Sequence, residues 1–114
     1  MKKVLAVHRH EEILRKIEQL APSGWHVRSM TNSIDAMLST RTEQYDLIFC
    51  CLDLPMVTGI EFVRSMRSLS VNKHTPVFIL SDGVETDAQR LLAEKLRIVW
   101  LRPEDVAAIA DLAI

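Results

Sequence analysis

The stretch that most constrains this fold is an unbroken apolar run over residues 47–51, with the turn-forming residues Pro55 and Gly59 after it. A run without alternating polar positions is typical of a central parallel strand that is covered on both faces. In open α/β sheets, binding and reacting groups usually lie where such strands end. We therefore expect a functional site near Cys51, the last residue of this run.

Length and charge narrow the class of protein. The 114 residues predict one domain, residues 1–114, and the apolar fraction of 48% is that of a soluble globular chain. A formal net charge of -1 argues against direct nucleic-acid binding, and no apolar run approaches the roughly 20 residues that cross a membrane. No signal peptide is visible, so a cytoplasmic protein is expected. The adjacent Cys50 and Cys51 are too close for an ordinary disulfide and are predicted to be reduced.

The rest of the chain repeats a strand-then-helix pattern. Strands are predicted to start near residues 3, 25, 46, 76 and 97, and each is followed by apolar residues at helical spacing. We predict a doubly wound α/β fold with five parallel strands in the order 2-1-3-4-5, which is the flavodoxin-like arrangement. The strand near residue 25 alternates and should be an edge. The apolar helix faces are predicted as Ile13, Leu14, Ile17 and Leu20; Ile34, Met37 and Leu38; Ile60, Val63, Met66 and Leu69; Ala88, Leu91 and Leu92; and Val106, Ile109, Ala110 and Ala113.

Polar residues follow the ends of the strands that should converge. They are His8, Arg9, Cys51, Ser81 and Arg102. Pro55 and Gly59 stand four and eight residues after Cys51, Ser81 stands 30 residues after it, and Arg102 precedes a proline.

This spacing resembles the receiver domain of two-component response regulators, and the resemblance covers essentially the whole chain. It implies a phosphorelay signalling module, often joined to an output domain, so the chain could be the N-terminal part of a longer protein. It also assigns Cys51 to the phosphoacceptor position, Ser81 to the switch hydroxyl, and Arg102 to the lysine position. His8 and Arg9 fall where the family has two carboxylates.

The chemistry departs from that pattern. Mg²⁺ in this family needs carboxylates, and His8, Arg9, Cys51 and Arg102 supply none. A family pocket with three acids and one lysine carries a charge of about -2, whereas two arginines without an acid give about +2 here. Each unit of charge changes the interaction with Mg²⁺ by roughly 3 kcal/mol at about 6 Å. Val99 also replaces the aromatic switch residue. We expect a degenerate pseudo-receiver with no catalytic residue, metal or cofactor, acting by phosphorylation-independent protein contact.

Three alternatives stay open at this point. Asp53 could serve as an unorthodox phosphoacceptor in an otherwise conventional receiver. Cys51 could be a reactive thiol that senses redox state, if nearby cations lower its pKa. Arg9, Ser81 and Arg102 could bind an anion, unless the arginines are solvated or paired with acids; the candidates are Glu11, Asp53 and Asp82.

The resemblance also implies an interaction face. Receivers commonly form dimers or bind a protein partner through the face of helix 4, strand 5 and helix 5, which corresponds to about residues 84–114. No nucleic-acid or membrane contact is expected of this domain.

Overall fold

The computed structural model describes residues 1–81, 83 and 86–109 of the chain. Its five strands form one parallel sheet in the order β2-β1-β3-β4-β5, which confirms the predicted fold class and strand order. The elements are β1 (Lys2–Val7), α1 (Glu11–Leu20), β2 (Trp25–Met30), α2 (Ser33–Thr42), β3 (Leu47–Cys51), α3 (Gly59–Leu69), β4 (Val77–Leu80), α4 (Asp87–Leu96), β5 (Ile98–Leu101), the 3-10 turn η1 (Pro103–Asp105) and α5 (Val106–Ile109).

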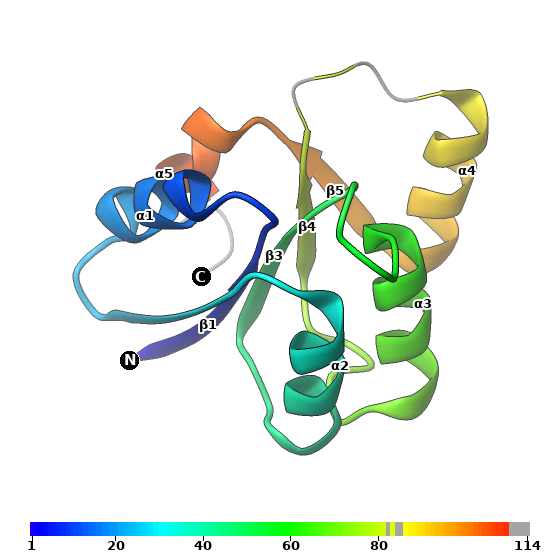
Figure 1. Ribbon diagram of the computed structural model, residues 1–114, viewed down its shortest axis with the longest axis horizontal. Helices are drawn as coiled ribbons and strands as arrows, with labels where there is room; N and C mark the ends of the chain where they lie inside the picture. Colours follow the sequence, from blue (N-terminus) through cyan, green and yellow to red (C-terminus); the bar gives the residue numbers. More distant parts are fainter. Residues whose placement is uncertain (82, 84–85, 110–114) are drawn as a thin grey trace.

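The sheet lies between two layers of helices. Figure 1 shows α1 and α5 on one side of it and α2, α3 and α4 on the other. Strand β3 is buried along its whole length: Phe49 packs with the α1 side, whereas Ile48 and Cys50 pack with the α3 side. Cys50 is therefore a core residue, as expected for the residue whose side chain points away from that of Cys51. Strand β2 lies at an edge, as predicted.

Polar caps fix where the helices begin. Asn32 accepts a hydrogen bond from the backbone N–H of Asp35 at the start of α2, and Thr58 does the same for Glu61 at the start of α3. Thr86 and Gln89 form a reciprocal capping box at the start of α4. These caps satisfy backbone donors that have no partner within the helix.

The predicted apolar face of α2 was wrong at Ile34 and Leu38, whereas Met37 packs against the core. Leu38 is 56% exposed, whereas the buried residues of this helix are Ser33, Ala36 and Thr40. Small side chains can lie against the core here because their hydroxyls have hydrogen-bond partners: Ser33 Oγ donates to the carbonyl of Pro55 in the loop after β3, and Thr40 Oγ1 donates to the Met37 carbonyl within α2. The helix continues to Thr42, through the polar residues that follow Leu38.

The last helix is described as far as Ile109. Proline at position 103 opens a 3-10 turn, and Val106–Ile109 are the described residues of the α-helix that follows. Val106 is fully buried against the α1 side of the sheet, as its predicted place on the apolar face requires. Ala110 and Ala113 lie outside the described residues.

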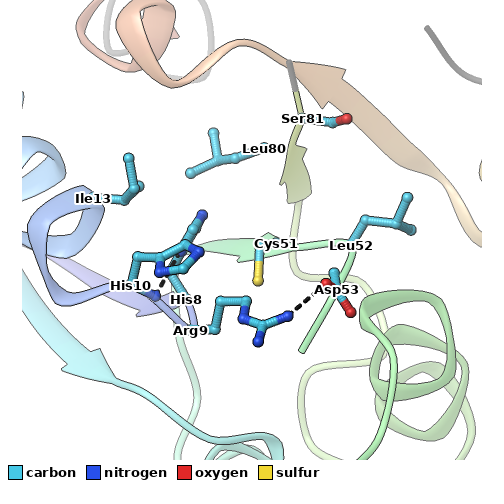
Figure 2. A pocket seen from close by; sticks show the side chains of 9 residues that line it. All are labelled: His8, Arg9, His10, Ile13, Cys51, Leu52, Asp53, Leu80 and Ser81. Atoms are coloured by element: carbon cyan, nitrogen blue, oxygen red, sulfur yellow. Dashed lines mark hydrogen bonds and ion pairs between the residues drawn. The ribbon is translucent and has the colours of Figure 1, made fainter. Parts of the chain in front are cut away.

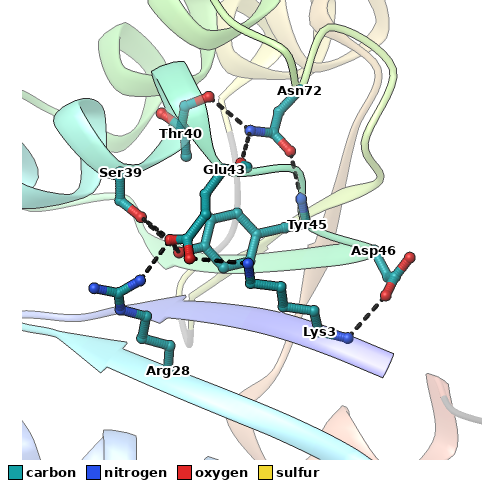
Figure 3. A network of polar contacts seen from close by, with 8 residues as sticks. All are labelled: Lys3, Arg28, Ser39, Thr40, Glu43, Tyr45, Asp46 and Asn72. Atoms are coloured by element: carbon teal, nitrogen blue, oxygen red, sulfur yellow. Dashed lines mark hydrogen bonds and ion pairs between the residues drawn. The ribbon is translucent and has the colours of Figure 1, made fainter. Parts of the chain in front are cut away.

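A network of polar side chains closes the amino-terminal end of the sheet (Figure 3). Asn72, fully buried, donates through Nδ2 to the carbonyls of Thr40 and Glu43, and its Oδ1 accepts from the Tyr45 backbone N–H. The Glu43 carboxylate accepts from Lys3 Nζ at 2.9 Å. This network ties α2, β3 and the α3–β4 connection together.

Candidate functional site

A hollow of about 350 Å³ opens at the carboxyl-terminal end of the sheet. It lies where β1, β3 and β4 end, which is the region that the strand order places together. Leu80 and Ile13 supply apolar wall, and the imidazole rings of His8 and His10 lie with centroids 5.6 Å apart (Figure 2). The described lining residues are His8, Arg9, His10, Ile13, Cys51, Leu52, Asp53, Leu80 and Ser81.

The loop after β3 is held by backbone contacts. The Gly59 N–H donates to the Leu52 carbonyl at 2.9 Å, and a Cβ at position 59 would lie 2.3 Å from the Cys51 carbonyl oxygen. Only glycine allows the start of α3 to approach the end of β3 this closely. Met56 is the central residue of a tight turn and has a positive φ of 74°. The Val57 N–H donates to the Pro55 carbonyl and closes this turn.

Arg9 and Asp53 form an ion pair across this hollow. The guanidinium Nη1 lies 2.6 Å from Asp53 Oδ2, and Figure 2 shows the Arg9 side chain passing below the Cys51 thiol to reach it. Both side chains are largely in solvent, with 43% and 83% of their surfaces exposed, so the pair is expected to contribute at most about 1 kcal/mol. The pairing offsets the positive charge that residue types alone predict for this pocket.

Cys51 is buried beneath these groups. Its residue surface is 5% exposed, and burial raises the pKa of its thiol, while hydrogen bonding from the Arg9 backbone opposes the shift by a smaller amount. This direction is opposite to the one that a reactive thiolate needs. His8 is 8% exposed, and its Nδ1 accepts a hydrogen bond from the backbone N–H of His10 at 3.1 Å.

Ser81 and Arg102 lie on the other side of the hollow. The Ser81 hydroxyl points away from Cys51 in Figure 2 and accepts from the Gly83 N–H at 3.2 Å. Arg102 lines a neighbouring hollow that also contains Ser81, Arg90 and Asp105, and it does not line the one around Cys51. An anion held by Arg9, Ser81 and Arg102 together would require Arg9 to leave Asp53.

Comparison with known protein families decides the class of this chain. Residues 4–111 match the model of the response regulator receiver domain. The chain belongs to this family. The chain that carries the spacing from Cys51 to Pro55, Gly59 and Ser81 is thus a receiver domain, and the hollow around Cys51 is called the receiver pocket below.

Solved structures share the fold of this receiver domain. The chemotaxis response regulator CheY4 of Vibrio cholerae superposes with a TM-score of 0.85 at 22% identity, covering 100% of this chain and 99% of that one. The cyanobacterial phytochrome response regulator RcpA, in its phosphorylated form, gives a TM-score of 0.84 at 22% identity over 97% and 92% of the two chains. A CheY-like receiver from Methanospirillum hungatei gives 0.82 at 16% identity over 99% and 94%. A comparison with curated proteins gives no match.

The residues of this pocket do not fit the Mg²⁺ ion that the family implies. Magnesium prefers oxygen ligands, usually including one or two carboxylates. Of the described residues that line the hollow, Asp53 alone has a carboxylate, and Arg9 is bonded to it. Within residues 1–81, 83 and 86–109 there is also no group of three histidine, cysteine or acidic side chains that could hold a metal.

In the same part of the chain, every helix is too short or too polar to span a membrane.

Sequence reasoning missed two residues that organise the opposite end of the domain. Neither Asn72 nor Arg67 stands out in the sequence, but Asn72 donates to a buried backbone carbonyl and Arg67 to a partly buried one. The one available signal was an asparagine placed between a helix and a strand, a position where its amide can complete the hydrogen bonds of both.

Proposed function

We propose that this receiver domain is a pseudo-receiver, which transmits a signal through protein contacts without being phosphorylated and without catalysing a reaction. The observation that carries the proposal is the Arg9–Asp53 ion pair beside Cys51. Cys51 stands at the position of the acceptor aspartate, and a thiol cannot form an aspartyl phosphate. The nearest acid, Asp53, is engaged by a cation of the protein itself, which leaves no carboxylate of the described pocket for Mg²⁺.

The proposed partner surface is the face formed by α4, β5 and α5. Two large apolar side chains are exposed there: Leu91 on α4 is 67% exposed, and Val99 on β5 is 50% exposed. Val99 replaces the aromatic residue that many receivers rotate on activation, so this face is proposed to be competent for binding in a single state. A second copy of the domain or another protein would cover these side chains.

Beryllofluoride with Mg²⁺, or acetyl phosphate with Mg²⁺, tests the absence of phosphorylation. We expect no change in the amide spectrum and no added mass, because the only carboxylate among the described pocket residues, that of Asp53, is paired with Arg9. A response of the unmodified protein would refute the proposal. If Asp53→Asn then abolished that response, Asp53 would be the acceptor of a conventional receiver.

A variant with restored chemistry provides the positive control. Cys51→Asp, His8→Asp, Arg9→Asp and Arg102→Lys together rebuild the acid set that the family uses, on a scaffold that already has the receiver fold. We expect this variant to bind beryllofluoride in the presence of Mg²⁺. The control shows that the assay can detect binding when the pocket supplies carboxylates.

The partner face has a control of its own. Leu91→Glu should weaken self-association or partner capture, as measured by sedimentation at increasing protein concentration. Leu38→Glu introduces the same charge at an apolar residue of similar exposure, 56%, on α2. If both variants behave alike, the α4–β5–α5 face is not the contact surface.

A further inference from the structure

Two arginines meet at the amino-terminal end of the sheet, opposite the receiver pocket. Arg67 of α3 donates to the carbonyls of Thr75 at 2.6 Å, Leu96 at 3.0 Å and Lys73 at 3.1 Å. Arg97, which follows α4, also donates to the Lys73 carbonyl, at 2.7 Å. The Lys73 carbonyl therefore accepts hydrogen bonds from the guanidinium groups of both Arg67 and Arg97.

The backbone at Arg97 adopts a conformation that favours glycine. Its φ and ψ are 57° and 48°, which is the left-handed region, at the end of α4. A non-glycine residue is strained there. The side chain is nevertheless fixed toward the α3–β4 connection, because Nη1 lies 3.2 Å from His74 Nδ1 in addition to the bond with Lys73.

Among the residues that the structure describes, no acid forms an ion pair with the cations at this end. The described ion pairs join Lys3, Arg9, Arg15, Arg28 and Arg90 to acids, and none involves Arg67, Lys73 or Arg97. Both guanidinium groups bond to neutral carbonyls, and the charge of Arg97 together with burial, the larger cause, lowers the pKa of Arg67. Arginine stays protonated all the same, so like charges are held together without a counter-charge.

We propose that this basic end, defined as Arg67, Lys73, His74 and Arg97, binds an acidic segment of a partner polypeptide. Carboxylates would supply the missing counter-charge, and the neighbouring Val71, which is 49% exposed, offers an apolar contact beside them. This surface adjoins the α4–β5–α5 face at Arg97, which lies between α4 and β5, and binding to it does not depend on whether the receiver pocket is phosphorylated.

The observations favour a polypeptide over a nucleic acid. The cluster carries three permanent charges, and the chain as a whole has a formal net charge of -1, so there is no extended basic stripe to follow a phosphate backbone. His74 is its one ring-bearing residue, which leaves no aromatic platform on which bases could stack.

The test is a titration of isotope-labelled protein with a short peptide of alternating glutamate and alanine, followed by amide chemical shifts. We expect shifts confined to residues 71–75 and 97, and an affinity that falls with added salt. A second peptide with glutamine in place of glutamate should produce no shifts. Equal shifts with both peptides, or no shifts with either, would overturn the proposal.

Variants assign the binding to this cluster. Arg97→Gly suits the left-handed backbone and should keep the fold while removing a charge, and Lys73→Gln removes another from an exposed position. Each should weaken peptide binding roughly two- to five-fold, the range of exposed charge pairs. Arg41→Gln, at an exposed arginine on α2, should leave the affinity unchanged. Unchanged affinity in the cluster variants, or tighter binding of a single-stranded oligonucleotide than of the peptide, would contradict the assignment.

Discussion

At the amino-terminal end of the sheet, buried side chains join separate elements, whereas the ion pair of the carboxyl-terminal hollow lies largely in solvent. Asn72 has no exposed surface and bonds to α2 and to the start of β3. In the receiver pocket the main polar contact is the Arg9–Asp53 pair, with an aspartate side chain that is 83% exposed. We infer that substitutions of pocket residues lower the free energy of unfolding little, whereas substitutions in the amino-terminal network lower it strongly.

Removing Asn72 should have the largest effect. Asn72→Ala leaves the carbonyls of Thr40 and Glu43 and the Tyr45 N–H without their buried partner, so we expect a loss of about 3 kcal/mol or more in the free energy of unfolding. Urea denaturation measures it. Ser81→Ala, in the pocket, should lose less than about 1 kcal/mol. Similar losses for the two variants would remove the proposed difference between the ends.

Gly59→Ala tests whether the carboxyl-terminal end is also demanding in its backbone. A Cβ at position 59 would lie 2.3 Å from the Cys51 carbonyl oxygen, and that contact is with backbone that cannot rotate away. We expect a loss of about 2 to 3 kcal/mol. Gly83→Ala is the matched control, since its Cβ would meet Ser81 Oγ at an ordinary 3.7 Å. If both glycines tolerate alanine equally, the close approach of α3 to β3 does not constrain the pocket.

The charged part of the amino-terminal network should show itself as a pH dependence. Hydrogen bonds from Lys3, then Tyr45 and Ser39, together with the charge of Arg28, lower the pKa of Glu43 from 4.5 to about 2. Because the folded pKa is depressed, the stabilisation is present above pH 4.5 and is lost as the pH falls toward 2. Urea midpoints across this interval should fall less steeply in Glu43→Gln. Parallel curves for the two proteins would show that Glu43 contributes nothing here.

The strands could be predicted because their signal is local. In a short α/β chain, a continuous apolar run such as residues 47–51 fits a central strand and few other elements. The positions of Pro55 and Gly59 after the run then indicated where the functional site lies. The face of α2 could not be predicted in the same way. Ile34 and Leu38 have helical spacing, but Ser33 and Thr40 are among the buried residues. The Ser33 hydroxyl bonds to Pro55, a partner that only the folded chain brings close, and the Thr40 hydroxyl bonds within its own helix.

The side-chain contacts of the pocket could not be predicted from the sequence either. Residue types placed Arg9, Ser81 and Arg102 at one sheet edge, and the structure does put them near the ends of β1, β4 and β5. Which arginine faces which acid depends on side-chain direction, and sequence spacing left three acids open for this role. Asp53 proved to be the partner of Arg9, while Arg102 lies in the adjoining hollow.

The smallest expected effect is the one that bears most directly on the comparison. A double-mutant cycle of Arg9→Ala and Asp53→Ala should give a coupling of about 0.2 to 1 kcal/mol, reduced by salt, because both side chains are largely solvated. A coupling above about 2 kcal/mol would mean that this pair holds the pocket as firmly as Asn72 holds the opposite end. The loop after β3 would then be locked by an internal cation, and divergence of the pocket residues would carry a structural gain of its own. A small coupling leaves Gly59 and the backbone as the elements that preserve the receiver shape around a pocket whose side chains are free to differ.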